Sequence, residues 1–555
     1  MWKKIEILSV LLAAAAATLP ADNNIVKTLK VTPAEGGSAF AVAKTGYVQV
    51  SGVHSPELTF TAADGGRRTV KVRENRAVIR LTPGRYTVNA ADVSVKKIGE
   101  NNFYSMVGNF TSDDMAKVTS DRRSGRYGMF LYNWKYLREN ILDPFTTLTL
   151  GSAYAPEIAE WRAEGRLIFR NAFVTVPPDA PRGLPLWNKL GDDDCVDGIG
   201  PDEFIVPAGR KDPDDASLGY TRPGHGFSEA HLQGIRDWLK KHPGKFFYTW
   251  LGIPWNGDCL AVKPLYDAVT SSPNGAILWE AYVNAKAGDE KMQTCYVTRG
   301  TLFKQASGGS LENYIIAPAT YEYMDNNGAM DFKVHLDRQF HLMATDPLFD
   351  NLRGFGMWAA YYTEPEILRW FARLVRHYGV DGETTMLSEK YGYKLYPGIL
   401  KAPNWENDKD WSLAGGAAPV PKKDTVLKQG YIPYTTQNFL RMEIGSGKHP
   451  SACQTLRNLE PGKLYRVKTL FCTPEHPEKS DIPVDLKLDN AEIVESELRY
   501  LQDFTRRSPH VWNVRKVVFR AGNDPVKLTL AEKEGAAAPA VVLVDMVQAA
   551  PYFSE

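Results

Sequence analysis

The chain has 555 residues, of which 43% are hydrophobic and 11% aromatic, so it can fill several packed cores and general disorder is excluded. Its 66 lysines and arginines balance 65 aspartates and glutamates without basic runs, which excludes nucleic acid and anionic membrane surfaces as expected partners. At roughly 100–200 residues per domain, about three domains are expected.

The first 21 residues, MWKKIEILSVLLAAAAATLPA, carry two lysines and then an apolar run that ends in small residues. This arrangement is typical of a secretory signal peptide. The run is shorter than the roughly 20 apolar residues of a membrane span, although a retained anchor is the alternative. We predict cleavage near Ala21, a mature protein without an integral span, and a secreted, periplasmic or cell-surface location.

Residues 25–98 contain short strand-like runs such as YVQVSGVH and AVIRLTPGRYTVNA. Turn sequences such as ADGG separate them, and hydrophobic residues alternate with a period of two. The pattern predicts an N-terminal β-sandwich with an accessory role.

Residues 99–401 alternate strand-like runs with helical segments such as APEIAEWRAEG. Such alternation predicts an α/β fold with parallel strands, and eight strands close a (β/α)8 TIM-like barrel. We assign the strands to FYSMVGNF, YGMFLYNW, FTTLTLG, LIFRNAFV, FFYTWLGI, AILWEAYVN, IIAPATYEY and GFGMWAAYY. If the first run belongs to the preceding sandwich, the closing strand must follow Gly379.

A segment rich in proline, glycine and aspartate spans residues 175–225 and is predicted to be a lid or a wall on the active face of the barrel. Its acidic residues suit either a structural calcium site or, as we prefer, a solvated loop. They are Asp192, Asp193, Asp194, Asp197 and Asp202. Within it, DGIGPDEF resembles the DGxDxDxE signature of chitinase-like family 18 barrels, but Gly200 replaces the second aspartate and no apolar strand precedes it, so we treat the match as accidental.

Three glutamates, Glu280, Glu322 and Glu364, lie 42 residues apart, about the length of one strand, helix and loop. Side chains at the carboxyl ends of successive barrel strands converge on one mouth. The spacing therefore predicts an acid/base site formed by these three carboxyl groups.

Each glutamate also has a structural alternative. Glu280 shares a strand face with Leu278, a residue expected to fill the barrel, which favours a functional role. Glu322 can instead pair with an arginine, and Glu364 can simply stabilise the first turn of a helix. Thr363 and Glu366 match a capping box, so Glu366 is assigned a structural role.

Aromatic residues crowd around these acids, and aromatic rings stack on the apolar faces of sugars. The predicted substrate-binding residues are Trp250, Trp255, Trp279, Tyr282, Asn284, Tyr323, Trp358 and Tyr362.

Five scattered cysteines and ten dispersed histidines show neither a CxxC nor an HExxH pattern, so we predict neither a catalytic metal nor a cofactor. Cys453 and Cys472 can form a disulfide across a predicted hairpin. A pair between Cys195 and Cys259 is a weaker alternative that leaves Cys295 as a free thiol.

Residues 402–423 read as a linker, and residues 424–555 are again rich in strands, such as LYRVKTLFC and VVLVDMVQAAPY. This tail resembles the jelly-roll, carbohydrate-binding-module-like β-sandwiches that follow secreted glycosidase barrels.

From about residue 100 onward, the architecture resembles a secreted multidomain TIM-barrel glycoside hydrolase. The resemblance implies a glycan substrate. We assign Glu280 as general acid and Glu364 as nucleophile or base, and Glu322 either orients the substrate or replaces one of them. The chain departs from the Asn-Glu clan of such enzymes, because Trp279 precedes Glu280 and the acids fall on strands six to eight. A non-catalytic glycan-binding surface protein is the main alternative. The oligomeric state stays open.

Overall fold

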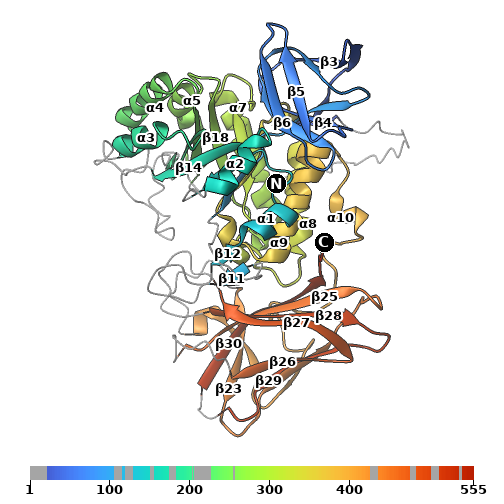
Figure 1. The fold of residues 1–555 in the computed structure, drawn as a ribbon. Coiled ribbons are helices and arrows are strands. Elements are labelled where there is room, and N and C mark those ends of the chain that lie inside the picture. The colour runs from blue at the N-terminus through green and yellow to red at the C-terminus, as the bar shows by residue number, and fades with distance from the viewer. Residues whose placement is uncertain are drawn as a thin grey trace, which may run out of the picture.

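The computed structural model describes residues 22–105, 116–118, 129–150, 155–173, 183–202, 204–205, 227–253, 257–425, 436–474, 483–501, 512–536 and 540–555. The predicted signal peptide lies outside this part of the chain. N-terminal antiparallel sheets pack on one end of a central barrel, and C-terminal antiparallel sheets lie at its other end (Figure 1).

The N-terminal sheets share a core of buried aliphatic and aromatic side chains that includes Val48, Leu58 and Ile79. The four-stranded sheet has the order β1 (Lys27–Thr28), β9 (Ser94–Ile98), β4 (Gly46–Ser51) and β7 (Arg76–Leu81). The five-stranded sheet has the order β2 (Thr32–Ala34), β3 (Gly37–Val42), β8 (Gly84–Val88), β5 (Glu57–Ala62) and β6 (Arg67–Lys71).

The central domain is a closed barrel of eight parallel strands. They are β10 (Asn102–Ser105), β13 (Thr147–Leu150), β14 (Leu167–Phe173), β15 (Gly198–Asp202), β17 (Phe246–Gly252), β18 (Gly275–Ala281), β19 (Tyr314–Pro318) and β20 (Gly354–Met357). Closure comes from the pairing of β20 with β10, in which Asn102 lies opposite Gly356. The short strand β16 (Phe204–Ile205) adds to β17.

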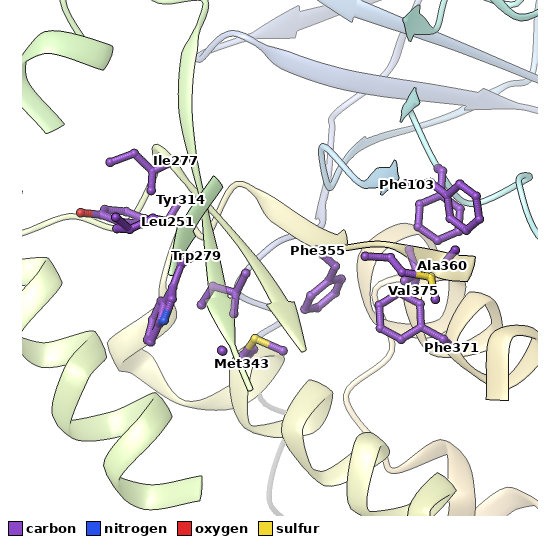
Figure 2. Packing of buried hydrophobic residues seen from close by; sticks show 14 of the residues in the cluster. Phe103, Leu251, Ile277, Trp279, Tyr314, Met343, Phe355, Ala360, Phe371 and Val375 are labelled. Atoms are coloured by element: carbon purple, nitrogen blue, oxygen red, sulfur yellow. The ribbon is translucent and has the colours of Figure 1, made fainter. Parts of the chain in front are cut away.

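The barrel strands bury both of their faces, as parallel strands generally do. Phe169, Tyr248 and Leu278 fill the interior, whereas Ile277 and Trp279 point outward into the layer that packs against the helices (Figure 2). The helices are α1 (Trp134–Asn140), α2 (Ala155–Ala163), α3 (Gly183–Gly191), α4 (Glu229–Lys241), α5 (Lys263–Val269), α6 (Gly288–Met292), α7 (Arg299–Ala306), α8 (Phe332–Thr345), α9 (Pro365–Arg376) and α10 (Leu387–Lys390).

The predicted number of strands is correct, but one of the eight assignments is wrong. The run YGMFLYNW forms β12 (Phe130–Tyr132), which pairs antiparallel with β11 (Ala116–Val118) outside the barrel. The fourth barrel strand is instead β15, GIGPD, inside the segment predicted to be an irregular loop. Glycine allows this close packing, since a Cβ on Gly198 would lie 2.3 Å from the Phe246 carbonyl oxygen.

The C-terminal sandwich consists of two antiparallel sheets. The four-stranded sheet has the order β21 (Ser412–Ala414), β24 (Ser451–Thr455), β29 (Lys527–Glu532) and β26 (Val484–Asp489). The six-stranded sheet has the order β22 (Ala418–Pro421), β23 (Asn438–Ile444), β30 (Ala540–Pro551), β25 (Leu464–Cys472), β28 (Trp512–Ala521) and β27 (Ala491–Tyr500).

Two predictions about this region are wrong. The segment taken as a linker supplies β21 and β22, and its Trp405 and Trp411 are buried in the sandwich core. Cys453 and Cys472 are free thiols, because β24 and β25 belong to different sheets and do not form a hairpin. Cys195, Cys259 and Cys295 are also free.

Among the described residues, no helix has both the length and the apolar character needed to cross a membrane.

Candidate active site

Glu280 lies at the carboxyl end of β18, one residue before the strand ends. It has the same strand parity as Leu278, which is buried in the barrel interior, so its side chain also faces inward. Burial and the Glu280 carboxylate raise the pKa of Tyr282 well above its usual value. Glu280 is half-buried, so it sits at the boundary between the barrel interior and the exterior.

Asp202 is the last residue of β15 and is only 3% exposed. Both of its carboxylate oxygens accept hydrogen bonds from the Trp358 indole N–H, at 3.2 and 3.0 Å. Burial, Glu280 and then Asp202 all raise the pKa of Tyr282, so both carboxylates act on the same phenol. The fourth and sixth strands thus bring two acids to one end of the barrel, which we call the mouth.

Aromatic rings surround these acids. We define the mouth aromatics as Tyr104, Trp250, Tyr282, Tyr321, Trp358, Tyr361 and Tyr362. Each lies within 4.3–6.3 Å of another member, measured between ring centroids. Trp358 and Tyr282 are half-buried like Glu280, so they combine a ring face with partial access from outside.

A polar position also lies on the inner face of β14. The Asn171 side-chain amide donates to the Tyr104 hydroxyl at 2.6 Å. The Asn171 Oδ1 and Trp250 Nε1 atoms are buried, and neither has a hydrogen-bond partner among the described residues. One accepts and the other donates, so both can bind a polar group or a water molecule.

Sequence reasoning missed Asp202 and Asn171 as site residues. Asp202 lies in DGIGPDEF, where glycine and proline replace the apolar residues that usually mark a buried strand. Asn171 lies in a strand that was predicted correctly. It is two residues after Phe169, which faces the barrel interior, so the alternation along the strand could have shown that Asn171 also faces inward.

Glu322 and Glu364 bind cations of the C-terminal sandwich, in its interface with the barrel. The Arg499 guanidinium forms a bidentate pair with Glu322. Arg466 lies 2.7 Å from Glu364, which is 1% exposed. Burial by itself would raise the pKa of Glu364, but Lys468 and Arg466 hold it well below its usual value. These positions contradict catalytic roles for Glu322 and Glu364.

The proposed capping box is also wrong. Helix α9 has Glu364 as its N-cap residue, without a side-chain hydrogen bond to the helix. Thr363 instead bonds the Thr320 hydroxyl at 2.7 Å. Glu366 is structural, but through Arg466 at 3.0 Å and Lys333 at 3.1 Å.

Of the other predicted binding residues, Trp279, Asn284 and Tyr323 make structural contacts. Trp279 points outward, where its ring packs 4.9 Å from Phe303, so a substrate contact is ruled out. Asn284 accepts a hydrogen bond from the Ala287 amide and caps a helical turn. Tyr323 packs against Tyr321 and a cluster of the sandwich. Trp255 lies outside the described residues.

The acidic residues near β15 bind separate partners. Asp192 pairs with Lys241 at 3.2 Å, and Asp193 accepts from the Cys195 amide. Asp197 pairs with Arg162 at 3.0 Å. Across the described ranges, no group of three or more histidine, cysteine, aspartate or glutamate side chains is placed to hold a metal ion.

No family model matches the chain, and no curated protein matches its sequence. Among solved structures, it is similar to the catalytic domain of a Pyrococcus furiosus chitinase, with 10% identity, a TM-score of 0.32, and coverage of 51% of this chain and 97% of that one. A Bacteroides uniformis β-glucuronidase has 7% sequence identity and a TM-score of 0.33, and the match covers 94% of this chain and 80% of that one. The module TmCBM61, whose structure is in complex with β-1,4-galactotriose, has 13% sequence identity and a TM-score of 0.19. The match covers 28% of this chain and 98% of that one. At these scores the likenesses carry no argument about activity.

Proposed function

We propose that the chain is a glycoside hydrolase whose active site is the barrel mouth. The observation that carries this proposal is that the side chains of Asp202 and Glu280 converge among the mouth aromatics, at the carboxyl ends of β15 and β18. Barrel enzymes keep their chemistry at this end. Glycosidic cleavage requires two carboxyl groups with different roles.

Glu280 is the general acid in this scheme. Its half-buried carboxyl group can give a proton to a glycosidic oxygen that approaches from outside the barrel. Asp202 is the ionised carboxylate in this scheme, and the Trp358 indole N–H donates a hydrogen bond to it at 3.0 Å, which favours the charged form. The Asp202 charge then stabilises the positive charge that develops on the sugar ring in the transition state.

The half-buried rings of Trp358 and Tyr282 would stack on the sugar. The near balance of 66 basic and 65 acidic residues supports a neutral or weakly charged glycan.

Glycan hydrolysis by the wild type, Glu280→Gln and Asp202→Asn tests the proposal. We expect each variant to lose about 10²-fold or more in kcat, while its affinity for oligosaccharides changes by only a few fold. Glu312→Gln is the control, since Glu312 is an exposed barrel carboxylate paired with Lys44. Binding by every version without product release would instead support a glycan-binding surface protein.

We also propose that the chain is exported after removal of its first 21 residues. In support, Asn23 and Asn24 lie just after this segment and donate hydrogen bonds to the carbonyl oxygens of Tyr378 and Met343. Cell fractionation and N-terminal sequencing of the full-length product test this, and an intact cytoplasmic chain would refute it.

A further inference from the structure

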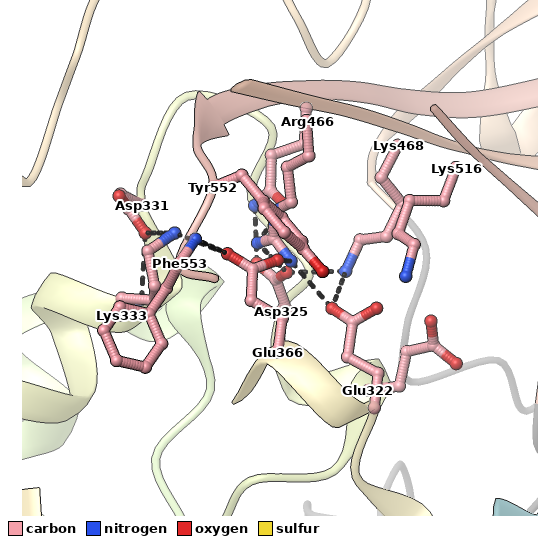
Figure 3. A network of polar contacts seen from close by, with 12 residues as sticks. Glu322, Asp325, Asp331, Lys333, Glu366, Arg466, Lys468, Lys516, Tyr552 and Phe553 are labelled. Carbon is pink, nitrogen blue, oxygen red and sulfur yellow. Dashed lines mark hydrogen bonds and ion pairs between the residues drawn. The ribbon is translucent and has the colours of Figure 1, made fainter. Parts of the chain in front are cut away.

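The interface between the barrel and the C-terminal sandwich contains ten charged side chains that are at most 6% exposed. The barrel contributes Glu322, Asp325, Asp331, Glu364, Glu366 and Lys333, and the sandwich contributes Arg466, Lys468, Arg499 and Lys516. The barrel set therefore carries a net charge of −4 and the sandwich set carries +4. Figure 3 shows Arg466 and Lys468 reaching from the sandwich toward the acids of the barrel.

Arg499, on β27, contacts three separate segments of the barrel. Its guanidinium forms the bidentate pair with Glu322 and lies 3.4 Å from Glu364. It also stacks 4.9 Å from the centroid of Phe130. These partners belong to the segments that follow β19, β20 and β10 at the mouth.

The same segments carry mouth aromatics. Glu322 directly follows Tyr321, and Glu364 lies two residues after Tyr362. The rings of Tyr321 and Tyr362 lie 5.7 Å apart. The Thr320 and Thr363 hydroxyls join the two segments. Movement of either carboxylate would therefore shift rings that line the mouth.

We propose that Arg499 is a positioning residue for this mouth, and that the C-terminal sandwich clamps the barrel loops after β19 and β20. The sandwich is then part of the active unit and not an independent module. The effect on substrate rests on the proposed glycoside hydrolase function, whereas the clamp itself rests only on the contacts of Arg499.

Hydrogen exchange of the full chain tests the clamp without any substrate. In Arg499→Gln, amides in residues 319–325 and 358–364 should exchange about tenfold faster than in the wild type, because local opening becomes easier. Arg520→Gln should match the wild type, since Arg520 lies on the same sheet but forms an exposed pair with Glu492. Unchanged exchange in both segments, or an equal rise in the N-terminal sheets, would overturn the proposal.

Arg499→Gln leaves the buried Glu322 charge without its main cation, which could unfold the protein. The double variant Glu322→Gln/Arg499→Gln controls for this, because it removes both buried charges together. It should fold and still show faster exchange in residues 358–364. Protected amides in that variant would contradict the clamp.

Oligosaccharide kinetics separate positioning from chemistry. Arg499→Gln should raise KM about tenfold with kcat within about threefold, because the rings bind sugar but do not transfer protons. A fall in kcat without a change in KM would refute the positioning role. If the wild type turns over no glycan while the exchange pattern holds, the proposed function fails and the clamp stands.

Discussion

Trp358 makes two kinds of contact at the mouth, one through its ring and one through its indole N–H. Its ring packs 5.5 Å from Tyr321 and 5.7 Å from Tyr362, and its N–H donates to both oxygens of Asp202. The side chain therefore provides a surface for a sugar and also fixes the orientation of a carboxylate. A substitution that keeps the ring and removes the N–H separates these contributions.

We expect Trp358→Phe to reduce kcat/KM by roughly 10- to 100-fold, because a hydrogen bond to a charged group contributes about 1.5–3 kcal/mol. Steady-state kinetics on the best glycan substrate measure this. Trp279→Phe is the matched control, since Trp279 is fully buried on the outer face and its indole N–H has no partner among the described residues. That control should lose stability and keep its kcat; equal losses of activity in the two variants would contradict the assignment.

Asp545 should make the folding stability depend on pH. Burial raises its pKa to about 6, and the Thr436 hydroxyl donates to it at 2.6 Å. A raised pKa means that the folded state holds the proton more tightly than the unfolded state. The stability contributed by protonated Asp545 is therefore present below its unfolded pKa of about 3.9 and is lost as the pH rises through about 6.

Over this window the loss is about 3 kcal/mol, at 1.36 kcal/mol per pKa unit. Asp545→Asn should remove this component from the pH dependence of the unfolding free energy. Denaturant titrations between about pH 4 and pH 7 measure the difference, and parallel curves for the two proteins would contradict the prediction.

Among the elements, β15 is the one whose sequence least resembles its structure. GIGPD is fully buried between β14 and β17 yet has no run of apolar residues. Its glycines permit close approach of the neighbouring strands. A Cβ on Gly198 would lie 2.6 Å from the Phe169 ring.

Gly198→Ala should therefore destabilise the protein by about 1–3 kcal/mol, since the neighbouring backbone cannot yield easily. Gly200→Ala is the matched control on the same strand, because its added Cβ would meet nothing closer than 3.5 Å. Thermal or denaturant unfolding measures both. Equal stability of the two variants would contradict the close packing of β15.

The regular spacing of the glutamates explains why only one of them reaches the site. Strands β18, β19 and β20 end at Ala281, Pro318 and Met357, so strand ends recur after 37 and 39 residues while the acids recur after 42. Glu280 thus lies within its strand, whereas Glu322 lies four residues and Glu364 seven residues past the end of theirs. Sequence periodicity predicted the parallel strands, but it could not predict this drift or the partner domain that binds Glu322 and Glu364.

For the whole molecule, seven of the eight barrel strands and the flanking β-rich regions could be predicted from their hydrophobic patterns, whereas β15 could not. The ion-pair network could not, because its members are far apart in sequence. Arg466 and Glu364, for example, are separated by 102 residues. Residues 402–423 were read as a linker because their strands are short and find their partners later in the chain, β21 with β24 and β22 with β23.

The network also predicts acid sensitivity. Although burial opposes ionisation, cations lower the pKa of Glu364 and of Glu366 in the folded state. Stability from these groups is present above their unfolded pKa of about 4.3 and is lost as the pH falls below it. Melting temperatures from about pH 3 to pH 6 should drop below about pH 4.5, and more steeply in the wild type than in Glu364→Gln. A flat profile for both would contradict this.

The most direct test of the central claim is a crystal structure of Glu280→Gln with a bound oligosaccharide that the wild type cleaves. The glycosidic oxygen of the scissile bond should lie about 2.6–3.2 Å from the side chain of residue 280, with a sugar ring against Trp358. An oligosaccharide bound only on the C-terminal sandwich, or in the barrel mouth with its scissile bond out of reach of residue 280, would contradict the account.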